Sequence, residues 1–394
     1  MKKQTQAIHL EYERRDAYDS LSVPVYNTLA YEFDNAAVMA EAFTDKIKAP
    51  DYSRVENPTV TNLERRVAAL TDAAHATAFN SGMAAISNTL MALAAQGKNI
   101  VTSKHLFGNT YALLVATLRR FGVKVRLRDL TNIEAVREAI DDDTCCVFLE
   151  ILTNPQLEVA DLKAISEVAH EKNVPLVVDS TVIPFTQFSA KSLGVDIEVV
   201  SSSKYVSGGA TSLGGLVIDY GTPYNGDFAK RLYGEMLFNF GAYMTPQVAY
   251  MQTIGLETLD ARYRVQSSNA LELAKKLRSL PQIKNVNYVG LEDNPYHELA
   301  QRQFGKTAGA MICIDLESKE ACFSFLNNLK LIHRATNLFD NRSLAIHPAS
   351  TIFGAFSESM RKSMDVKDTT IRLSVGLEDA DDLFEDIKQA VNSL

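Results

Sequence analysis

Short runs rich in β-branched residues alternate with segments of helical spacing between about residue 75 and residue 204 of this 394-residue chain. The apolar runs are NIVTSK (99–104), GVKVRLRD (122–129), CCVFLEIL (145–152), PLVVDSTV (175–182) and IEVVSSSK (197–204). Helical spacing is clear in ADLKAISEVAHEKN (160–173). This alternation predicts a mostly parallel sheet covered on both faces by helices. Such sheets bind ligands at the carboxyl ends of their strands, which are here residues 150–154, 179–181 and 201–204.

The texture of the sequence changes after about residue 250. The later part contains a helical run, a strand-like run and an amphipathic run: LETLDARYRVQSSNALELAKKL (256–277), GAMICIDL (309–316) and DADDLFEDIKQAVNSL (379–394). We therefore predict a large ligand-binding domain over residues 61–250 and a smaller α+β domain over residues 251–394. Residues 1–60 have little periodicity and contain prolines, which discourage regular structure. We expect them to form an extended arm that contacts a neighbouring subunit.

The composition argues against several classes of protein. With 46% hydrophobic and 22% charged residues it is ordinary for a globular chain, and no apolar run approaches the roughly 18 residues of a membrane span. The N-terminus lacks the apolar stretch of a secretory signal, and the net charge of −8 disfavours a nucleic-acid partner. The four cysteines lack the spacing of a metal site. We expect a cytoplasmic protein with reduced cysteines and without a metal, membrane segment or nucleic-acid partner.

Lys204 lies directly after one of the predicted strands. Ser201 and Ser203 precede it, and Gly208 and Gly209 follow it. Most lysines are solvated surface charges, but a long ammonium side chain after a buried strand is unusual. A desolvated lysine has a lowered pKa and can form a Schiff base, and the neighbouring serine hydroxyls suit a phosphate group. The pattern favours a covalently held cofactor that carries a phosphate.

Asp179 ends the apolar run that comes before the strand of Lys204. A buried carboxylate is costly unless it pairs with a cation. Pyridoxal phosphate supplies such a cation, because its ring nitrogen must stay protonated, and an aspartate with a Schiff-base lysine is the usual contribution of the protein. The alternative is that Asp179 is only a helix N-cap or a turn residue. Together with Lys204, it favours pyridoxal 5'-phosphate as the cofactor.

Further cofactor contacts are expected at two strand-to-helix junctions. The Ser-Gly turn of FNSGMAAI enters a predicted helix, where free backbone N–H groups favour an anion, so that Ser81, Gly82 and Met83 are candidate phosphate ligands. Phe107 lies at the second junction, where its ring could stack on the pyridine ring. Each feature is weak by itself, since Ser-Gly caps are common and Phe107 could belong to the core. Thr181, near the end of a strand run, completes the set expected around the cofactor.

The order and spacing of the motifs resemble those of a known enzyme family. The motifs are YSRVENPT (52–59), SGMAAI (81–86), VVDST (177–181), SSSKY (201–205), IHPAS (346–350) and IRLSVGLED (371–379). They resemble the Cys/Met-metabolism family of pyridoxal-phosphate enzymes, which includes cystathionine synthases and lyases, methionine γ-lyases and O-acetylhomoserine sulfhydrylases. The resemblance covers nearly the whole chain. It implies an α/β, aminotransferase-like fold of type I with a smaller C-terminal domain, and a homotetramer made of two intimate dimers.

The resemblance also implies a role for individual residues. It implies that Lys204 carries the cofactor and shuttles protons, and that Asp179 pairs with the pyridinium nitrogen. It implies that Ser201, Ser203, Gly82 and Met83 bind the phosphate of the cofactor. It also implies that Tyr52 and Arg54 reach the phosphate of the neighbouring subunit. It implies a group that binds the carboxylate of an amino-acid substrate: Arg372, Asn154 and Asn337. A guanidinium suits that bidentate task.

Three positions distinguish the chain within this family. Phe107 stands where most members have a tyrosine, whose hydroxyl is often assigned to protonating the leaving group. Acid catalysis then falls to Tyr52, Lys204 or water, or is dispensable for a good leaving group such as acetate. Asn109 stands where methionine γ-lyases typically carry a cysteine. Asn337 stands where lyases and cystathionine synthases more often carry a serine.

The sequence therefore favours γ-replacement in methionine biosynthesis, in which O-acetyl-L-homoserine and a sulfur donor give L-homocysteine and acetate. A methionine or homocysteine γ-lyase and a cystathionine γ-synthase are the alternatives. A non-catalytic scaffold is disfavoured because Lys204, Asp179 and Arg372 are all present. The sulfur donor is left open between sulfide, a thiol and the thiocarboxylate of a carrier protein, and so is the choice between acetyl and succinyl homoserine.

Overall fold

The larger sheet contains the strand runs expected from the sequence. The computed structural model describes residues 1–10, 16–44 and 46–394, and within these the larger sheet has seven strands in the order β1-β7-β6-β5-β4-β2-β3. The strands are β1 (His75–Phe79), β2 (Asn99–Ser103), β3 (Lys124–Arg128), β4 (Thr144–Glu150), β5 (Leu176–Asp179), β6 (Ile197–Val200) and β7 (Gly215–Asp219). Strands β2 to β6 pair in parallel, whereas β7 is antiparallel to both β6 and β1. The prediction of a mostly parallel sheet is confirmed.

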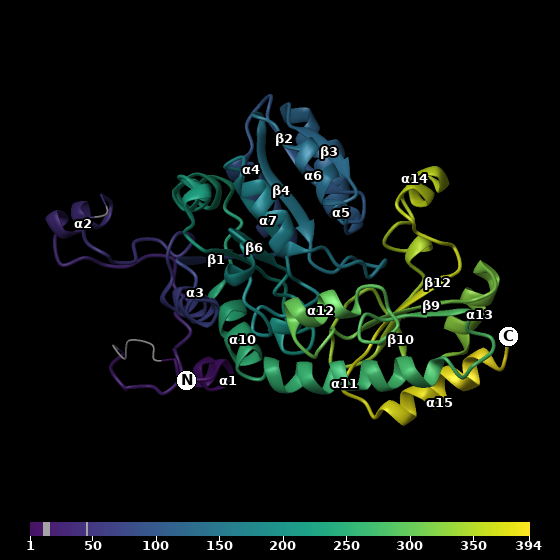
Figure 1. Ribbon diagram of the computed structural model, residues 1–394. Coiled ribbons are helices and arrows are strands. Elements are labelled where there is room, and N and C mark those ends of the chain that lie inside the picture. The colour runs from purple at the N-terminus through teal and green to yellow at the C-terminus, as the bar shows by residue number, and fades with distance from the viewer. Residues whose placement is uncertain (11–15, 45) are drawn as a thin grey trace.

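Helices cover both faces of this sheet, and the strands are apolar for that reason (Figure 1). In β5, Val177 belongs to one core cluster and Val178 to the other, and Phe148 and Leu149 of β4 divide in the same way. Successive side chains of a strand point to opposite faces, so the sheet is buried on both. Two helices show the arrangement, because α7 (Leu162–His170) packs on the side of Val178 and α4 (Gly82–Leu93) on the side of Val177.

A smaller, mostly antiparallel sheet follows in the second part of the chain. Its order in the described residues is β10-β11-β12-β9-β8, and only β10 and β11 pair in parallel. The strands are β8 (Asn285–Asn287), β9 (Met311–Asp315), β10 (His333–Arg334), β11 (Leu344–Ile346) and β12 (Thr370–Ser374). The long helices α11 (Leu259–Leu277) and α15 (Ala380–Val391) run side by side along this part of the molecule (Figure 1).

The other α-helices connect these elements. They are α1 (Lys3–His9), α2 (Ala36–Ala42), α3 (Pro58–Thr71), α5 (Gly108–Ala112), α6 (Ile133–Ala139), α8 (Phe228–Arg231), α9 (Phe238–Phe240), α10 (Pro246–Glu257), α12 (His297–Phe304), α13 (Lys319–Asn328) and α14 (Glu358–Ser363). Among the described residues, none of the helices combines the length and apolar character needed to cross a lipid bilayer.

The N-terminal segment is less irregular than the sequence suggests. Helix α1 packs on its own chain, where the Lys3 ammonium donates to the Phe188 carbonyl at 2.8 Å and the Arg66 guanidinium donates to the Ala7 carbonyl at 2.7 Å. These partners lie far away in the sequence, so local periodicity gives no sign of the helix. Helix α2 stands apart from the body of the molecule (Figure 1).

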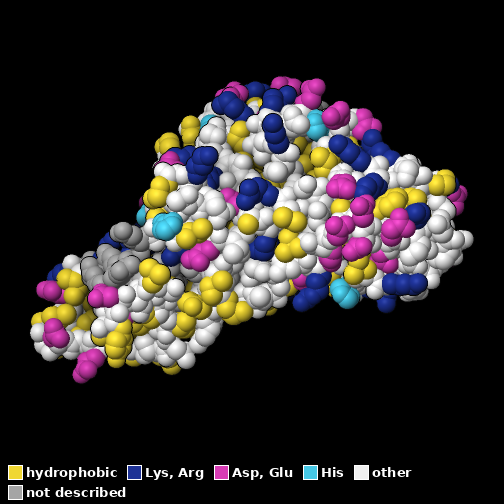
Figure 2. Space-filling model, turned by 90° about the horizontal axis from the view of Figure 1, so that it is seen from below, with side chains coloured by type: hydrophobic (Ala, Val, Ile, Leu, Met, Phe, Trp, Pro, Cys, Tyr) yellow, Lys and Arg dark blue, Asp and Glu magenta, His cyan; other side chains and the backbone are white. Residues whose placement is uncertain are grey.

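The segment over residues 16–44, called the projecting segment below, carries many exposed apolar side chains. Figure 2 shows hydrophobic side chains gathered over this part of the surface. Those exposed by more than half are Tyr18 (90%), Leu21 (83%), Leu29 (64%) and Phe43 (58%). Scattered exposed apolar residues are normal, but a concentration of them marks an interaction surface.

Candidate active site

Three neighbouring parallel strands bring their last residues to one edge of the larger sheet. Glu150 at the end of β4 is opposite Asp179 at the end of β5, and Asp179 is opposite Val199 of β6. The chain leaves β6 at Val200 and reaches Lys204 within one turn. The sequence prediction that these strand ends lie together is therefore confirmed.

Lys204 reaches across to the smaller part of the chain. Its ammonium donates to Asn337 Oδ1 at 2.8 Å. Burial and the positive charge of Arg372 lower the pKa of Lys204, the negative charge of Asp179 opposes them, and the net value is about 8. About a tenth of the amine is therefore neutral at pH 7, far more than for an ordinary lysine, and the neutral form is the one that attacks a carbonyl carbon or accepts a proton.

Asp179 is held by the turn that follows its own strand. Its carboxylate accepts a hydrogen bond from the Thr181 N–H at 2.9 Å. Burial raises the pKa of Asp179, while the bonds from Thr181 and the charge of Lys204 lower it. Such a carboxylate is stabilised by a cationic partner, and a protonated pyridine nitrogen is a partner of that kind.

Four of the predicted phosphate ligands meet where α4 begins: Ser81, Gly82, Met83 and Ser201. A Cβ atom placed on Gly82 would lie 2.5 Å from the Ser201 Cβ atom, so only glycine allows this approach. Ser81 caps α4 by accepting a hydrogen bond from the Ala84 N–H at 3.1 Å. The first N–H groups of the helix, those of Gly82 and Met83, have no acceptor within it and can bind an anion.

Two other hydroxyls of this region are used within the protein. The Thr181 Oγ1 atom accepts a hydrogen bond from the Ser201 N–H at 2.8 Å and so fixes the turn that leads to the lysine. The Ser203 hydroxyl donates to the Gly214 carbonyl at 3.1 Å and accepts from the Gly214 N–H at 2.9 Å. The contact of Ser203 with a phosphate therefore stays a prediction.

Arg372 is a buried cation surrounded by neutral groups. Lying in β12 with 2% of its surface exposed, it donates to Asn154 Oδ1 and to the Asn337 carbonyl, both at 3.1 Å. Its Nε atom has no hydrogen-bond partner, and no ion pair joins it to a carboxylate among the described residues. Burial lowers its pKa to about 10, which still leaves it charged. A buried, unpaired guanidinium fits the carboxylate of a bound substrate.

Glu150 is a site residue to which sequence analysis assigns no role. Its carboxylate accepts hydrogen bonds from the Phe107 N–H and from the Asn154 N–H. Burial and the charge of Asp179 raise its pKa to about 8. The only sign of Glu150 in the sequence is that it lies at the end of a predicted strand. Ordinary turn residues lie at such positions too, so the position alone does not indicate a site residue.

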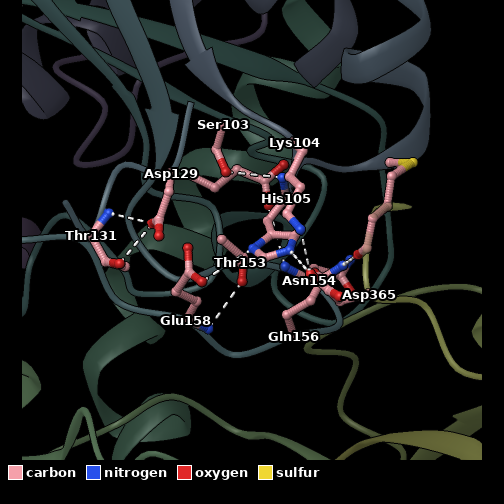
Figure 3. A network of polar contacts seen from close by, with 12 residues as sticks. Ser103, Lys104, His105, Asp129, Thr131, Thr153, Asn154, Gln156, Glu158 and Asp365 are labelled. Atoms are coloured by element: carbon pink, nitrogen blue, oxygen red, sulfur yellow. Dashed lines mark hydrogen bonds and ion pairs between the residues drawn. The ribbon is translucent and has the colours of Figure 1, made fainter. Parts of the chain in front are cut away.

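A second polar network supports the same loops from outside. His105, two residues before Phe107, contacts Glu158 at 3.1 Å through Nδ1 and Asp365 at 2.8 Å through Nε2 (Figure 3). Lys104 also pairs with Asp365, at 2.7 Å. The network joins the loop after β2, the loop after β4 and the segment after α14.

Tyr52 and Arg54 lie together in the N-terminal segment. The Arg54 guanidinium is 5.5 Å from the centre of the Tyr52 ring and donates to the Phe238 carbonyl at 2.5 Å. The contacts of the described residues do not join either side chain to Lys204 or Asp179 of the same chain. Their expected role at the cofactor of a neighbouring subunit stays a prediction.

These residues fit pyridoxal phosphate. Lys204 offers a partly neutral amine, Asp179 a carboxylate for the ring nitrogen, and the Gly82 turn a close approach for a phosphate. A model of the family described as Cys/Met metabolism PLP-dependent enzyme matches residues 4–392.

The chain belongs to this family. It is thus an enzyme that uses pyridoxal phosphate in the metabolism of sulfur amino acids.

Individual relatives of this enzyme have two different activities. It is 37% identical to an L-methionine gamma-lyase from Fusobacterium nucleatum subsp. polymorphum, over 99% of this chain and 98% of the relative. It is 32% identical to an O-acetyl-L-homoserine sulfhydrylase from Corynebacterium glutamicum, over 98% and 95%. A solved structure assigned as an O-acetylhomoserine (thiol)-lyase from Campylobacter jejuni has a TM-score of 0.95 and 35% identity, with 100% of both chains covered. That structure contains N'-pyridoxyl-lysine-5'-monophosphate, and the fold expected from the sequence is confirmed.

We expect borohydride to fix pyridoxal phosphate to the peptide that carries Lys204. Because the pKa of this lysine is about 8, the rate at which the cofactor-free protein takes up pyridoxal phosphate should rise only about tenfold from pH 7 to pH 9, against about a hundredfold for an ordinary lysine. Peptide mapping and stopped-flow absorbance check both points, with Lys204→Ala as the control. Cofactor found on any other lysine would contradict the assignment.

We expect His105→Gln to destabilise the protein more at pH 5.5 than at pH 8.5. Burial lowers the pKa of His105, but the hydrogen bonds to Glu158 and Asp365 and the charge of Glu158 outweigh burial and raise the pKa overall. The stabilisation is therefore complete below the pKa of an unfolded histidine and is lost as pH rises through the folded value. The loss in free energy of unfolding should be about 2 kcal/mol at pH 5.5, as for hydrogen bonds to charged groups.

The charged or ionisable groups Lys104, Asp129 and Tyr296 lie near His105. They are unchanged in the His105→Gln variant, so their contribution is the same in the wild type and in the variant. Urea unfolding at the two pH values measures the effect. His75→Gln is the matched control, because His75 is exposed at the start of β1. An equal pH dependence in the two variants would contradict the prediction.

Proposed function

We propose that the enzyme catalyses γ-replacement in methionine biosynthesis. O-acetyl-L-homoserine and a sulfur donor are converted to L-homocysteine and acetate. The observation that carries the choice of reaction is Phe107, which lies against the carboxyl edge of the sheet beside Glu150 and offers no hydroxyl to a leaving group. The sulfur donor is free sulfide, which gives L-homocysteine directly, the thiocarboxylate of a carrier protein, whose acyl group must then be released by hydrolysis, or a thiol, which would give the S-substituted homocysteine instead.

The carboxylate of the substrate is bound next to the base that removes its α-hydrogen. Arg372 binds the carboxylate, and Asn154 and Asn337 hold the guanidinium in place. Asn337 also holds the amine of Lys204 through its side-chain oxygen, so the base lies next to the carboxylate site. This arrangement selects an α-amino acid and presents its α-hydrogen to Lys204.

Pyridoxal phosphate, when bound, supplies an electron sink for negative charge on the carbon beside the amino group. Lys204 removes the proton from the α-carbon and then one from the β-carbon, and its pKa of about 8 suits it to accept and return protons near neutral pH. Asp179 keeps a proton on the ring nitrogen of the cofactor. Gly82, Met83 and Ser201 bind the phosphate.

The leaving group separates the proposed reaction from elimination. Acetate leaves as a stable carboxylate and needs little help from an acid, whereas the thiolate of methionine gains more from a proton donor. Phe107 has no proton to give, and the side chain of Asn109 is not a thiol. Both residues favour an acylhomoserine over methionine.

Methionine γ-elimination is the second candidate, and a specific observation favours it. The relative that is 37% identical over almost the whole chain is an L-methionine gamma-lyase. The sulfhydrylase from C. glutamicum is 32% identical. The difference between 37% and 32% identity does not separate the two activities, because a few residues at the site can change which reaction is catalysed. The local chemistry of Phe107 therefore decides the order of the two proposals.

We further propose that the site is shared between subunits of a homotetramer built from two dimers. Tyr52 and Arg54 follow the projecting segment in the sequence, and they contact each other rather than Lys204 of their own chain. The exposed apolar side chains of that segment would be covered by the neighbouring subunit (Figure 2). Tyr52 and Arg54 then reach the phosphate bound by the partner, and Tyr52 is placed to move a proton there.

We expect a mixture of Arg54→Ala and Lys204→Ala proteins to recover activity that neither has alone. A hybrid dimer contains one site in which both residues are intact, so random exchange should restore up to about a quarter of wild-type activity. Activity assays after unfolding and refolding of the mixture test this, with each variant refolded alone as the control. Hybrid dimers that form but stay inactive would show that each site uses one chain.

We expect turnover of O-acetylhomoserine with sulfide to exceed methionine elimination by at least about a hundredfold in kcat/KM, or about 2.7 kcal/mol. Product analysis of homocysteine and of 2-oxobutyrate measures the two reactions. The matched variant Phe107→Tyr adds a hydroxyl and should narrow the ratio by raising the elimination rate. If wild-type enzyme forms 2-oxobutyrate from methionine at a comparable kcat/KM, the lyase replaces the sulfhydrylase as the function.

A further inference from the structure

Glu150 is a buried carboxyl group at the active site that the proposed reaction does not use. It ends β4, only 7% of its surface is exposed, and its neighbour across the sheet is Asp179. No ion pair joins it to a cation among the residues that the structure describes. Two carboxyl groups side by side repel each other, so this position carries an energetic cost.

The contacts of Glu150 connect two separate segments. One carboxylate oxygen accepts a hydrogen bond from the Phe107 N–H at 2.5 Å, where α5 begins. The other accepts one from the Asn154 N–H at 3.3 Å, in the loop after β4. The Asn154 side chain in turn accepts from Arg372. A single carboxyl group thus lies between the residue expected to face the cofactor ring and the group that orients the substrate-binding arginine.

We propose that Glu150 is a positioning residue for both halves of the site. By holding Phe107 and Asn154 through their backbone N–H groups, it sets the position of the aromatic ring relative to that of Arg372. This inference rests on the roles proposed above for Phe107 and Arg372. It does not depend on which γ-substituent the substrate carries.

The residue type agrees with this role. An ionised glutamate has two acceptor oxygens and no donor, so above its pKa of about 8 Glu150 accepts from both N–H groups at once. A glutamine of the same size would turn its NH₂ group toward one of them and lose that bond. The two N–H donors also oppose the effects of burial and of Asp179, which raise the pKa of Glu150 to about 8.

The test compares amino-acid binding at pH 9, where Glu150 is mostly ionised, by holoenzymes of wild type, Glu150→Gln and Glu150→Ala. L-Norleucine is the probe, because it has the α-amino acid portion but no γ leaving group, and the absorbance of the cofactor reports its binding. We expect Glu150→Ala to raise the apparent Kd for norleucine by about tenfold, equivalent to about 1.4 kcal/mol. Glu150→Gln should lie between it and wild type, since one of the two bonds is kept. The visible circular dichroism of the bound cofactor should change in the same order.

Glu64→Gln is the matched control. Glu64 also accepts a backbone hydrogen bond, from the Ala78 N–H at 2.7 Å, and burial raises its pKa to about 8 as well. It lies in α3, outside the site, and its substitution should leave norleucine binding and the dichroism unchanged. If Glu64→Gln alters norleucine binding and the dichroism as much as Glu150→Gln does, any buried glutamate has this effect and the proposal is wrong.

An unchanged Kd and an unchanged dichroism in folded Glu150→Gln would also overturn the proposal. This variant keeps the side-chain volume, so it decides the matter if Glu150→Ala fails to fold. A wild-type enzyme that binds norleucine but does not carry out γ-replacement would overturn the proposed function and leave the role of Glu150 in place. The two failures are therefore distinguishable.

Discussion

The parallel pairing of β4, β5 and β6 is the constraint on which the rest of the site depends. Because the three strands end at one edge, Glu150 and Asp179 become neighbours and Lys204 follows on the next strand. Two buried carboxyl groups at such a position need donors. The N–H groups of Phe107 and Thr181 are among those that provide them. The hydrogen bonds that stabilise the strand ends thus also fix the loops that follow the strands, and these loops surround the candidate site.

A continuous chain of hydrogen bonds connects the two sheets through this site. It passes in order through Phe107, Glu150, Asn154, Arg372, Asn337 and Lys204. The first half holds the Phe107 N–H group and the Arg372 guanidinium, and the second half holds the amine of Lys204, the proposed base. Asn337 has a double function here, because its carbonyl holds Arg372 and its side-chain oxygen holds Lys204. In the proposed reaction, the same residue therefore sets the position of the substrate and that of the base.

The sequence predicts the parts of the site that depend on local pattern. Lys204 and Asp179 stand out because a charged side chain after an apolar run needs an explanation, and the runs themselves predict the sheet. Arg372 is recognised only through family resemblance, because an arginine in a strand-like run looks like an exposed surface residue. Glu150 has no distinguishing signal in the sequence, because one of its hydrogen-bond donors is the Phe107 N–H, 43 positions away. Helix α1 is missed for the same reason: its stabilising contacts are tertiary.

The distances along the chain between bonded site residues have a consequence for folding. Asn154 and Arg372 are 218 positions apart, and Lys204 and Asn337 are 133 positions apart. Contacts of such long range close large loops and form late. A partly folded chain with only the larger sheet would contain Lys204 and Asp179 but no carboxylate site. Recovery of amino-acid binding after dilution from denaturant therefore requires that both sheets have assembled.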